Sequence, residues 1–249
     1  MSDTTSPTRE VRLVDDATAG DREFIPGSGK ASLMWSYDLM TAAMGIGKHL
    51  DRLVEVAEIH PGQRVLEIGC GTGNLALRAA AAGAVVTGLD PDWGALARAA
   101  RKARRRRLGV TLVRGYADHL PAEDASVDHV ISSFALHHIP TDQKQAMAAE
   151  LLRVLRPGGT VTILDFADSS TPDAGSYGHE HGRSHKHGGG GGRLARRRTQ
   201  AAYVADNLDH GIARLLEGAG LTDTRERAAT AVLHRVPVAY VQARRPEHP

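Results

Sequence analysis

Cysteine is nearly absent from this chain of 249 residues, with Cys70 the single example. One cysteine excludes a disulfide within the chain and a cysteine-rich zinc site. Aromatic residues are also few, at 4%, so leucine, valine, isoleucine and alanine must fill the core. Charge of one sign shows no excess either: 31 Lys and Arg against 29 Asp and Glu give a net charge of +2, which requires no polyanionic partner.

Long hydrophobic runs are missing as well. No apolar stretch approaches the roughly 18 residues that a membrane-spanning helix needs, and no charged-then-apolar leader is present. We therefore expect a cytoplasmic protein without a transmembrane segment. Hydrophobic residues still make up 41% of the chain, so it can form one substantial α/β core with additions.

The stretch that most clearly indicates a site is Val65 to Asn74, which reads VLEIGCGTGN. A short apolar run of strand formers passes through three glycines into good helix formers, Leu75 to Ala80. Strand, glycine turn and helix begin a doubly wound α/β unit, whose ligands lie beyond the carboxyl ends of the strands. Glycines let the backbone approach a ligand, and Glu67, an acid in a buried strand, needs a cationic or hydrogen-bonding partner.

The spacing of Gly69, Gly71 and Gly73 narrows the class of ligand. It is G-x-G-x-G rather than the dinucleotide pattern G-x-G-x-x-G, and no Lys-Ser/Thr follows as in a P-loop. An acid at the strand end also suits an ammonium group better than a pyrophosphate. These residues resemble motif I of class I S-adenosylmethionine (SAM)-dependent methyltransferases, in which the turn passes under the methionine and ribose of the cofactor. A tight turn without a ligand is the alternative.

Further segments resemble the same family. The expected second strand, Ala84 to Leu89, ends on Asp90, about 20 residues beyond the glycines, where a ribose hydroxyl pair would be held. The run LLRVLRPGGTVTILDF is also similar to the family. The resemblance implies a doubly wound, Rossmann-like α/β fold: a seven-stranded sheet, mostly parallel with an antiparallel last strand, and helices on both faces.

The turn after the expected third strand, Val110 to Arg114, departs from the family pattern. The family commonly has Gly-Asp-Ala here, with an acid that receives the exocyclic amine of adenine. In this chain Tyr116 takes the usual Asp position and Asp118 follows two residues later. We expect Asp118 to receive the amine, with the Ala117 backbone nearby, but the departure leaves open which group does so.

The resemblance places the acceptor after the expected fourth strand, Val127 to Ser133. Methyl transfer from a sulfonium is an in-line displacement that depends largely on alignment, so a base is needed only when the acceptor must lose a proton. His137 is the best-placed candidate base, and a packing loop histidine is the alternative. Because neighbours on extended backbone point apart, we expect one of His137 and His138 to be structural.

Tyr37 is the second candidate on the acceptor side. The segment Tyr37-Asp38-Leu39-Met40 resembles the entry segment of quinone-biosynthesis and phospholipid methyltransferases, which helps to cover the cofactor. A helix that packs on the sheet edge is the alternative for this segment.

Composition divides the chain into parts. Residues 1–25 are expected to form a poorly ordered tail, 26–60 a helical cap and 61–249 the SAM-binding domain. The His- and Gly-rich stretch at about 168–198 is expected to be a flexible insertion. The basic run 101–107 is interpreted as a solvated helix end, which the helix dipole favours, with phosphate binding as the alternative.

The insertion contains two H-x-H pairs. Neutral imidazoles suit Zn, Ni and Cu, so four of them on one segment can hold an ion weakly and in a pH-dependent way. A solvated linker with incidental histidines is the alternative. The histidines of this speculative metal site are His179, His181, His185 and His187.

The sequence as a whole favours a SAM-dependent methyltransferase that acts on a small molecule, quinone-like or lipid-like. Glu67 is expected to meet the methionyl ammonium and Asp90 the ribose hydroxyls. A SAM-binding sensor is the alternative, and a nucleic-acid methyltransferase, for which no appended module is present, is a weaker one. Glycine spacing and Glu67 disfavour an NAD(P) oxidoreductase. The residues expected to bind the cofactor are Glu67, Gly69, Cys70, Gly71, Gly73, Asp90, Pro91, Ala117, Asp118 and Ser133.

Overall fold

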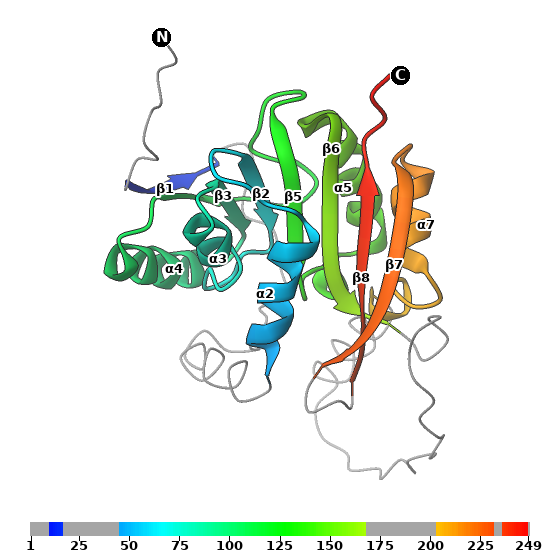
Figure 1. Cartoon of the computed structure of the whole chain (residues 1–249), viewed down its shortest axis with the longest axis horizontal. Helices are drawn as coiled ribbons and strands as arrows, with labels where there is room; N and C mark the ends of the chain where they lie inside the picture. Colours follow the sequence, from blue (N-terminus) through cyan, green and yellow to red (C-terminus); the bar gives the residue numbers. More distant parts are fainter. Residues whose placement is uncertain (1–9, 17–44, 168–202, 232–235, 249) are drawn as a thin grey trace.

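The computed structural model describes residues 10–16, 45–167, 203–231 and 236–248. In these parts a single sheet lies between two layers of helices (Figure 1). Its strands are β1 Val11–Asp15, β2 Arg64–Ile68, β3 Val85–Asp90, β4 Val110–Arg114, β5 Val127–Ser133, β6 Leu155–Phe166, β7 Thr222–Ala231 and β8 Val236–Arg244. The helices are α2 Ile46–Val56, α3 Ala76–Ala81, α4 Trp93–Arg106, the 3₁₀ turn η2 Leu136–His138, α5 Thr141–Val154 and α7 Gly211–Gly218.

The strand order is β1-β4-β3-β2-β5-β6-β8-β7. From β2 the chain moves outward through β3 to β4, and then crosses to β5 and moves outward through β6 on the other side. These pairs are parallel, whereas β8 is antiparallel to both of its neighbours, β6 and β7. The expected doubly wound, mostly parallel fold with an antiparallel last strand is confirmed, and its switch point lies between β2 and β5.

The number of strands corrects the sequence prediction, because the sheet has eight strands and not seven. The additional strand is β1, which pairs in parallel with β4 from Val11↔Val110 to Asp15↔Arg114. Its residues lie in the stretch expected to be a poorly ordered tail. Val11 and Leu13 pack against the core while Arg12 and Val14 are exposed, the period-2 alternation that a half-buried edge strand requires.

Two hydrophobic cores cover the two faces of the sheet. Residues of α2, α3 and α4 pack with one set of strand side chains, including Val65 and Val86. Residues of α5 and α7 pack with the alternate set, including Leu66 and Leu89. Successive side chains of a strand point to opposite faces, so alternate residues of the apolar runs in β2 and β3 pack into the two different cores.

The starts of two helices, α4 and α7, have different physical causes. The helix α4 begins where Asp92 accepts hydrogen bonds from the backbone N–H of Gly94 and Ala95, at 2.8 and 3.1 Å, a normal N-cap. The sequence predicts one helix from Tyr203 to Glu217, but the structure interrupts it, and α7 starts only at Gly211. Asp209 and His210 have φ of 51° and 59°, and two consecutive left-handed residues cannot continue a right-handed helix.

The longest helices of the described ranges, α4 and α5, have 14 residues each. None of the helices in these ranges has the length and apolar character that crossing a bilayer demands.

Candidate functional site

The parallel strands β2 to β6 all end at one edge of the sheet, where the glycine turn after β2 and the η2 turn after β5 flank the switch point. These two turns are in direct contact at Gly69. Its φ is +70°, and a Cβ added there would lie 2.3 Å from the Cβ of Ala135. Only glycine permits both this backbone conformation and this approach, so Gly69 joins the two turns.

Gly71 differs from the other glycines of the turn in what surrounds it. Its φ is +49°, and a Cβ added there would meet nothing within 4 Å. A Cβ at Gly73 would instead lie 2.9 Å from Ala99 of α4. Gly69 and Gly73 thus serve close packing, whereas Gly71 faces open space at the edge where doubly wound folds hold their ligands.

Asp90 ends β3 and holds the glycine turn in place. One of its carboxylate oxygens accepts a hydrogen bond from the N–H of Gly71 at 2.7 Å, and the other accepts one from the N–H of Asp92 at 2.8 Å. Burial raises the pKa of Asp90 to about 6, against the lowering effect of these two N–H groups. A carboxylate has about four acceptor positions, so Asp90 keeps capacity for hydroxyl donors. Pro91, expected beside it, follows directly at the end of β3.

Glu67 is the second acid beside the turn, and it is 1% exposed. Its Oε2 has no hydrogen-bond partner among the residues that the structure describes. Burial raises the pKa of Glu67 well above its ordinary value, and the charge of Asp90 adds to the rise, against a hydrogen bond from the backbone of Ala76. A buried acid with an unpartnered oxygen is destabilising unless a donor arrives from outside. A ligand ammonium is such a donor.

Cys70 lies within the turn, but its side chain faces the interior. It is buried, and a Cβ added at Gly88 of β3 would lie 2.9 Å from its Sγ. Burial raises the pKa of the Cys70 thiol, and the charges of Asp90 and Glu67 add to this effect. A neutral, packed thiol is a poor nucleophile, so only the backbone of Cys70 belongs to the candidate site.

A lysine that the sequence interpretation missed supports the turn from α4. The Nζ of Lys102 donates to Oγ1 of Thr72 and to Oδ1 of Asn74, both at 2.9 Å. Lys102 belongs to the basic run treated as a solvated helix end, and only its neighbours in that run, such as Arg104 and Arg105, are exposed. The spacing of charged residues along one helix does not show which of them faces a loop.

The turn with the expected adenine contacts follows β4, whose Arg114 pairs with Asp90 in the sheet register. Ala117 and Asp118 are half-buried at this edge, whereas Tyr116, in the position where the family has its acid, is 9% exposed and belongs to the core. The role of Asp118 toward adenine stays a prediction.

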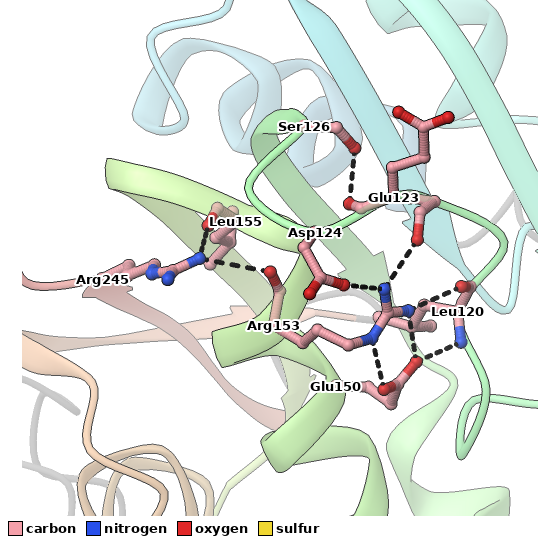
Figure 2. A network of polar contacts seen from close by, with 9 residues as sticks. Leu120, Glu123, Asp124, Ser126, Glu150, Arg153, Leu155 and Arg245 are labelled. Atoms are coloured by element: carbon pink, nitrogen blue, oxygen red, sulfur yellow. Dashed lines mark hydrogen bonds and ion pairs between the residues drawn. The ribbon is translucent and has the colours of Figure 1, made fainter.

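A polar network holds the loop that comes after this turn (Figure 2). Arg153 of α5 donates to Glu150, to Asp124 and to two backbone carbonyls of the loop, with distances of 2.7 to 3.1 Å. Glu150 in turn accepts the N–H of Leu120 at 2.8 Å, and the hydrogen bond from Arg153 lowers the pKa of Glu150. The network fixes the end of the turn against α5.

On the acceptor side, β5 ends at Ser133, which is half-buried next to the switch point. The following histidines lie in a 3₁₀ turn and not on extended backbone, so their rings do not point apart but lie with centroids 4.0 Å apart. Nδ1 of His137 is 2.8 Å from Oδ1 of Asp165, which is fully buried near the end of β6. Asp165 was missed, although an acid in a buried strand is the same signal that singled out Glu67.

Lys144 was also missed. Although 3% exposed, it donates to the backbone carbonyl of Tyr203 and to Oδ1 of Asn207, at 2.6 and 2.8 Å. Burial lowers the pKa of Lys144, against the raising effect of Asp206. The contacts attach the first turn of α5 to residues 203–207, which the sequence had suggested only as part of a regular helix.

Several predicted residues lie outside the described residues: Tyr37 and the four histidines His179, His181, His185 and His187. In the parts that the structure does describe, no group of three or more His, Cys, Asp or Glu side chains is arranged to hold a metal. The metal prediction therefore stays a prediction about the insertion.

The strand order and the glycine turn define a doubly wound α/β domain with a candidate ligand site at its switch point. The family model for the methyltransferase domain matches residues 65–159, which run from the strand before the turn to the start of β6. Over these residues, the chain is similar to the methyltransferase domain family.

Three individual proteins show how far the similarity extends along the chain. The ubiquinone/menaquinone biosynthesis C-methyltransferase UbiE of Xanthomonas oryzae is 36% identical over 162 residues, which cover 61% of this chain and 63% of that protein. Phosphoethanolamine N-methyltransferase 2 of Haemonchus contortus, solved with S-adenosyl-L-methionine, has a TM-score of 0.66 at 19% identity over 91% of this chain and 61% of that one. The [4+2]-cyclase SpnF has a TM-score of 0.61 at 20% identity, over 80% of each chain. The match thus spans less than two thirds of the first two proteins.

Proposed function

We propose that this chain binds SAM at the carboxyl edge of the sheet and transfers its methyl group to a small molecule. One observation carries the proposal: within the segment that matches the methyltransferase family, a fully buried glutamate presents an unpartnered oxygen beside the glycine turn. The ammonium of a methionyl group supplies the charge and the N–H donors that this oxygen lacks. The fold alone does not support methyl transfer, because the [4+2]-cyclase SpnF has a similar fold.

The residues of the site fit the cofactor in its separate parts. Glu67 receives the ammonium, Gly71 leaves space for the ligand, and Asp90 has acceptor capacity for the ribose hydroxyls. Asp118, at the end of the neighbouring turn, is assigned to the adenine amine. Bound SAM supplies a methyl group on a positively charged sulfur, and the contribution of the chain is to hold that group in line with an acceptor.

Calorimetry with SAM, its demethylated product and NAD tests the binding. We expect SAM and the product to bind and NAD to give no heat of binding. Glu67→Gln removes the charge without changing the shape and is expected to weaken SAM binding about 10- to 100-fold, the effect of losing a charged hydrogen bond. Glu226→Gln on β7, whose carboxylate contacts His210 at 2.7 Å, is the matched control and should leave SAM affinity unchanged. Binding of NAD in place of SAM would contradict the proposal.

For the acceptor we propose a quinone-like or lipid-like small molecule. The support is the likeness to UbiE and, for the fold, to phosphoethanolamine N-methyltransferase 2. A tritiated-methyl assay on quinols, phospholipid headgroups, RNA and DNA compares the acceptor classes. Methylation of RNA or DNA without methylation of any small molecule would reverse this assignment, and SAM binding without turnover on any acceptor would favour the sensor alternative.

A further inference from the structure

Asp165 is surrounded by hydrogen-bond donors. Its Oδ2 accepts from the N–H groups of Leu136 and His137, at 2.9 and 3.3 Å, and its Oδ1 accepts from the N–H of Phe166 at 2.8 Å. Because three backbone donors converge on this carboxylate, it acts as an acceptor on both oxygens. The ring nitrogen Nδ1 of His137, 2.8 Å from Oδ1, is therefore the donor in the fourth hydrogen bond.

This hydrogen bond decides the tautomer of His137. A neutral imidazole carries one N–H and one lone pair, so a proton on Nδ1 leaves the lone pair on Nε2. The side chain of His137 is 9% exposed and that of Asp165 is fully buried. A carboxylate that holds one nitrogen of a histidine, with the other nitrogen left basic, is the arrangement that orients a general base and stabilises it after it takes a proton.

The groups around the two neighbouring histidines favour His137, and not His138, as the base. His138 lies beside it on η2, and burial, together with the charge of His137, lowers the pKa of His138 to about 4. His138 thus stays neutral near pH 7. Asp165 faces His137 from β6, and Lys144 of α5 interacts electrostatically with Asp165. The carboxylate of Asp165 is hydrogen-bonded to the ring of His137, so it lies where it can compensate the positive charge of a protonated His137.

Aromatic rings line the same place. The ring centroid of Phe166 is 4.7 Å from that of His137, and the rings of Phe134 and Phe166 are 5.6 Å apart. Both are half-buried, and they are two of the three phenylalanines in the chain. Phe134 has a φ of +52°, a strained conformation that is concentrated at functional sites. Aromatic faces beside a base suit a flat, apolar molecule.

We infer that His137 removes a proton from the acceptor, that Asp165 positions and stabilises His137 as it does so, and that the acceptor is a phenol- or enol-type hydroxyl compound with a flat apolar body. This inference rests on the proposed methyl transfer and adds the acceptor chemistry. The O–H bond breaks, its proton goes to Nε2 of His137 and its electron pair stays on the acceptor. That pair forms the new bond to the methyl carbon while the carbon–sulfur bond breaks toward sulfur, which leaves as a neutral thioether. His137 then releases its proton to water.

The first test uses para-nitrophenol, whose phenolate absorbs in the visible range. With S-adenosylhomocysteine bound, no methyl group is available and only the proton transfer is seen. We expect the bound phenol to ionise at a lower pH in the wild type than in water, and His137→Gln to abolish the shift. Para-nitroanisole, which has no dissociable proton, is the control ligand. Absence of the shift in the wild type, or an equal shift in His137→Gln, would overturn the inference.

The second test observes the free protein by nitrogen NMR of the histidine rings. His137 is expected to carry its proton on Nδ1, and Asp165→Asn should disturb this preference while the His210 signal stays unchanged. His210 is the matched control because its Nδ1 also contacts a carboxylate, that of Glu226, at 2.7 Å. A proton on Nε2 of His137 in the wild type would contradict the assignment of the base.

Turnover gives the third readout. With a phenol as the acceptor, His137→Gln should lower kcat about 10²- to 10⁴-fold, the usual range for a general base. Asp165→Asn should also lower kcat, with a smaller change in KM. His210→Gln should behave as wild type. SAM affinity by calorimetry should stay within about threefold in all three variants. If the wild type does not bind SAM, the proposed function is wrong. If the wild type binds SAM but His137→Gln has an unchanged kcat, only this inference is wrong.

Discussion

At the scale of single residues, two buried acids have opposite environments. Glu67 has an oxygen without a partner in the described structure, whereas Asp165 accepts four hydrogen bonds. Burying a carboxylate is unfavourable unless donors surround it. The hydrogen bonds of Asp165 are therefore satisfied within the protein, so this side chain is suited to position a neighbour. Those of Glu67 are satisfied only when a ligand supplies a donor.

The glycine turn offers a matched pair of substitutions. Gly69→Ala introduces both a left-handed alanine, which costs about 1–2 kcal/mol, and a contact of 2.3 Å with Ala135, so we expect it to lower the free energy of unfolding by about 2–4 kcal/mol. Gly71→Ala meets no protein atom within 4 Å, so it should lower stability only by the backbone term but weaken SAM binding at least about tenfold. Urea unfolding and calorimetry measure the two effects. Equal losses of stability in both variants would contradict this division of roles.

At the scale of secondary-structure elements, the position of a loop depends on one helix. Arg153 of α5 connects to Glu150 on its own helix and to Asp124 and backbone carbonyls in the loop between β4 and β5 (Figure 2). The same loop begins directly after the turn that holds Asp118. The helix therefore packs on the sheet and at the same time fixes an edge of the candidate site.

Removal of this connection should have a measurable effect. Arg153→Met is expected to lower the free energy of unfolding by about 1–2 kcal/mol, because two part-buried carbonyls lose their donor and Glu150 and Asp124 lose their partner. Arg52→Met is the control: Arg52 forms an exposed ion pair with Glu55, with side chains 50% and 63% exposed, and its loss should cost about 0.5 kcal/mol or less. Denaturant unfolding compares the two. Similar values for both variants would show that the network of Arg153 is no stronger than a surface ion pair.

At the scale of the whole molecule, the sheet separates two cores. Ile131 of β5 belongs to the core with α2, α3 and α4, and Ile212 of α7 belongs to the core on the other face. Side chains that share no partner make independent contributions to stability. The three layers thus behave as two packed interfaces that share one sheet (Figure 1).

Conservative substitutions on the two faces test this separation. Ile131→Val and Ile212→Val are each expected to lower the free energy of unfolding by about 0.5–1.5 kcal/mol, the usual effect of removing one buried methylene. The double variant should equal the sum of the single variants within about 0.5 kcal/mol. Guanidinium unfolding of all four proteins gives the interaction energy. A larger departure from additivity would show that the two cores are coupled through the sheet.

The order of the elements and much of the glycine turn could be predicted because their signals are local. The apolar strand before Gly69 and the strand that ends on Asp90 can each be recognised within ten residues, and the parallel arrangement follows from the alternation of strands and helices. The short strand β1 could not, because five alternating residues become a strand only when β4 offers a partner. The break before α7 was missed for a similar reason: helix propensity is local, whereas Lys144 fixes residues 203–207 from another helix.

By itself the sequence determined the doubly wound class and the positions of the acids Glu67 and Asp90 on their strands, because spacing along the chain translates directly into position along a strand. The candidate site at the strand ends stays a prediction. The tertiary structure alone decided which distant groups meet there. His137 and Asp165 are 28 residues apart, and Thr72 and Lys102 are 30 apart. Such pairs depend on the register of neighbouring strands and on the direction in which each turn leaves the sheet, and no periodicity in the sequence encodes either quantity.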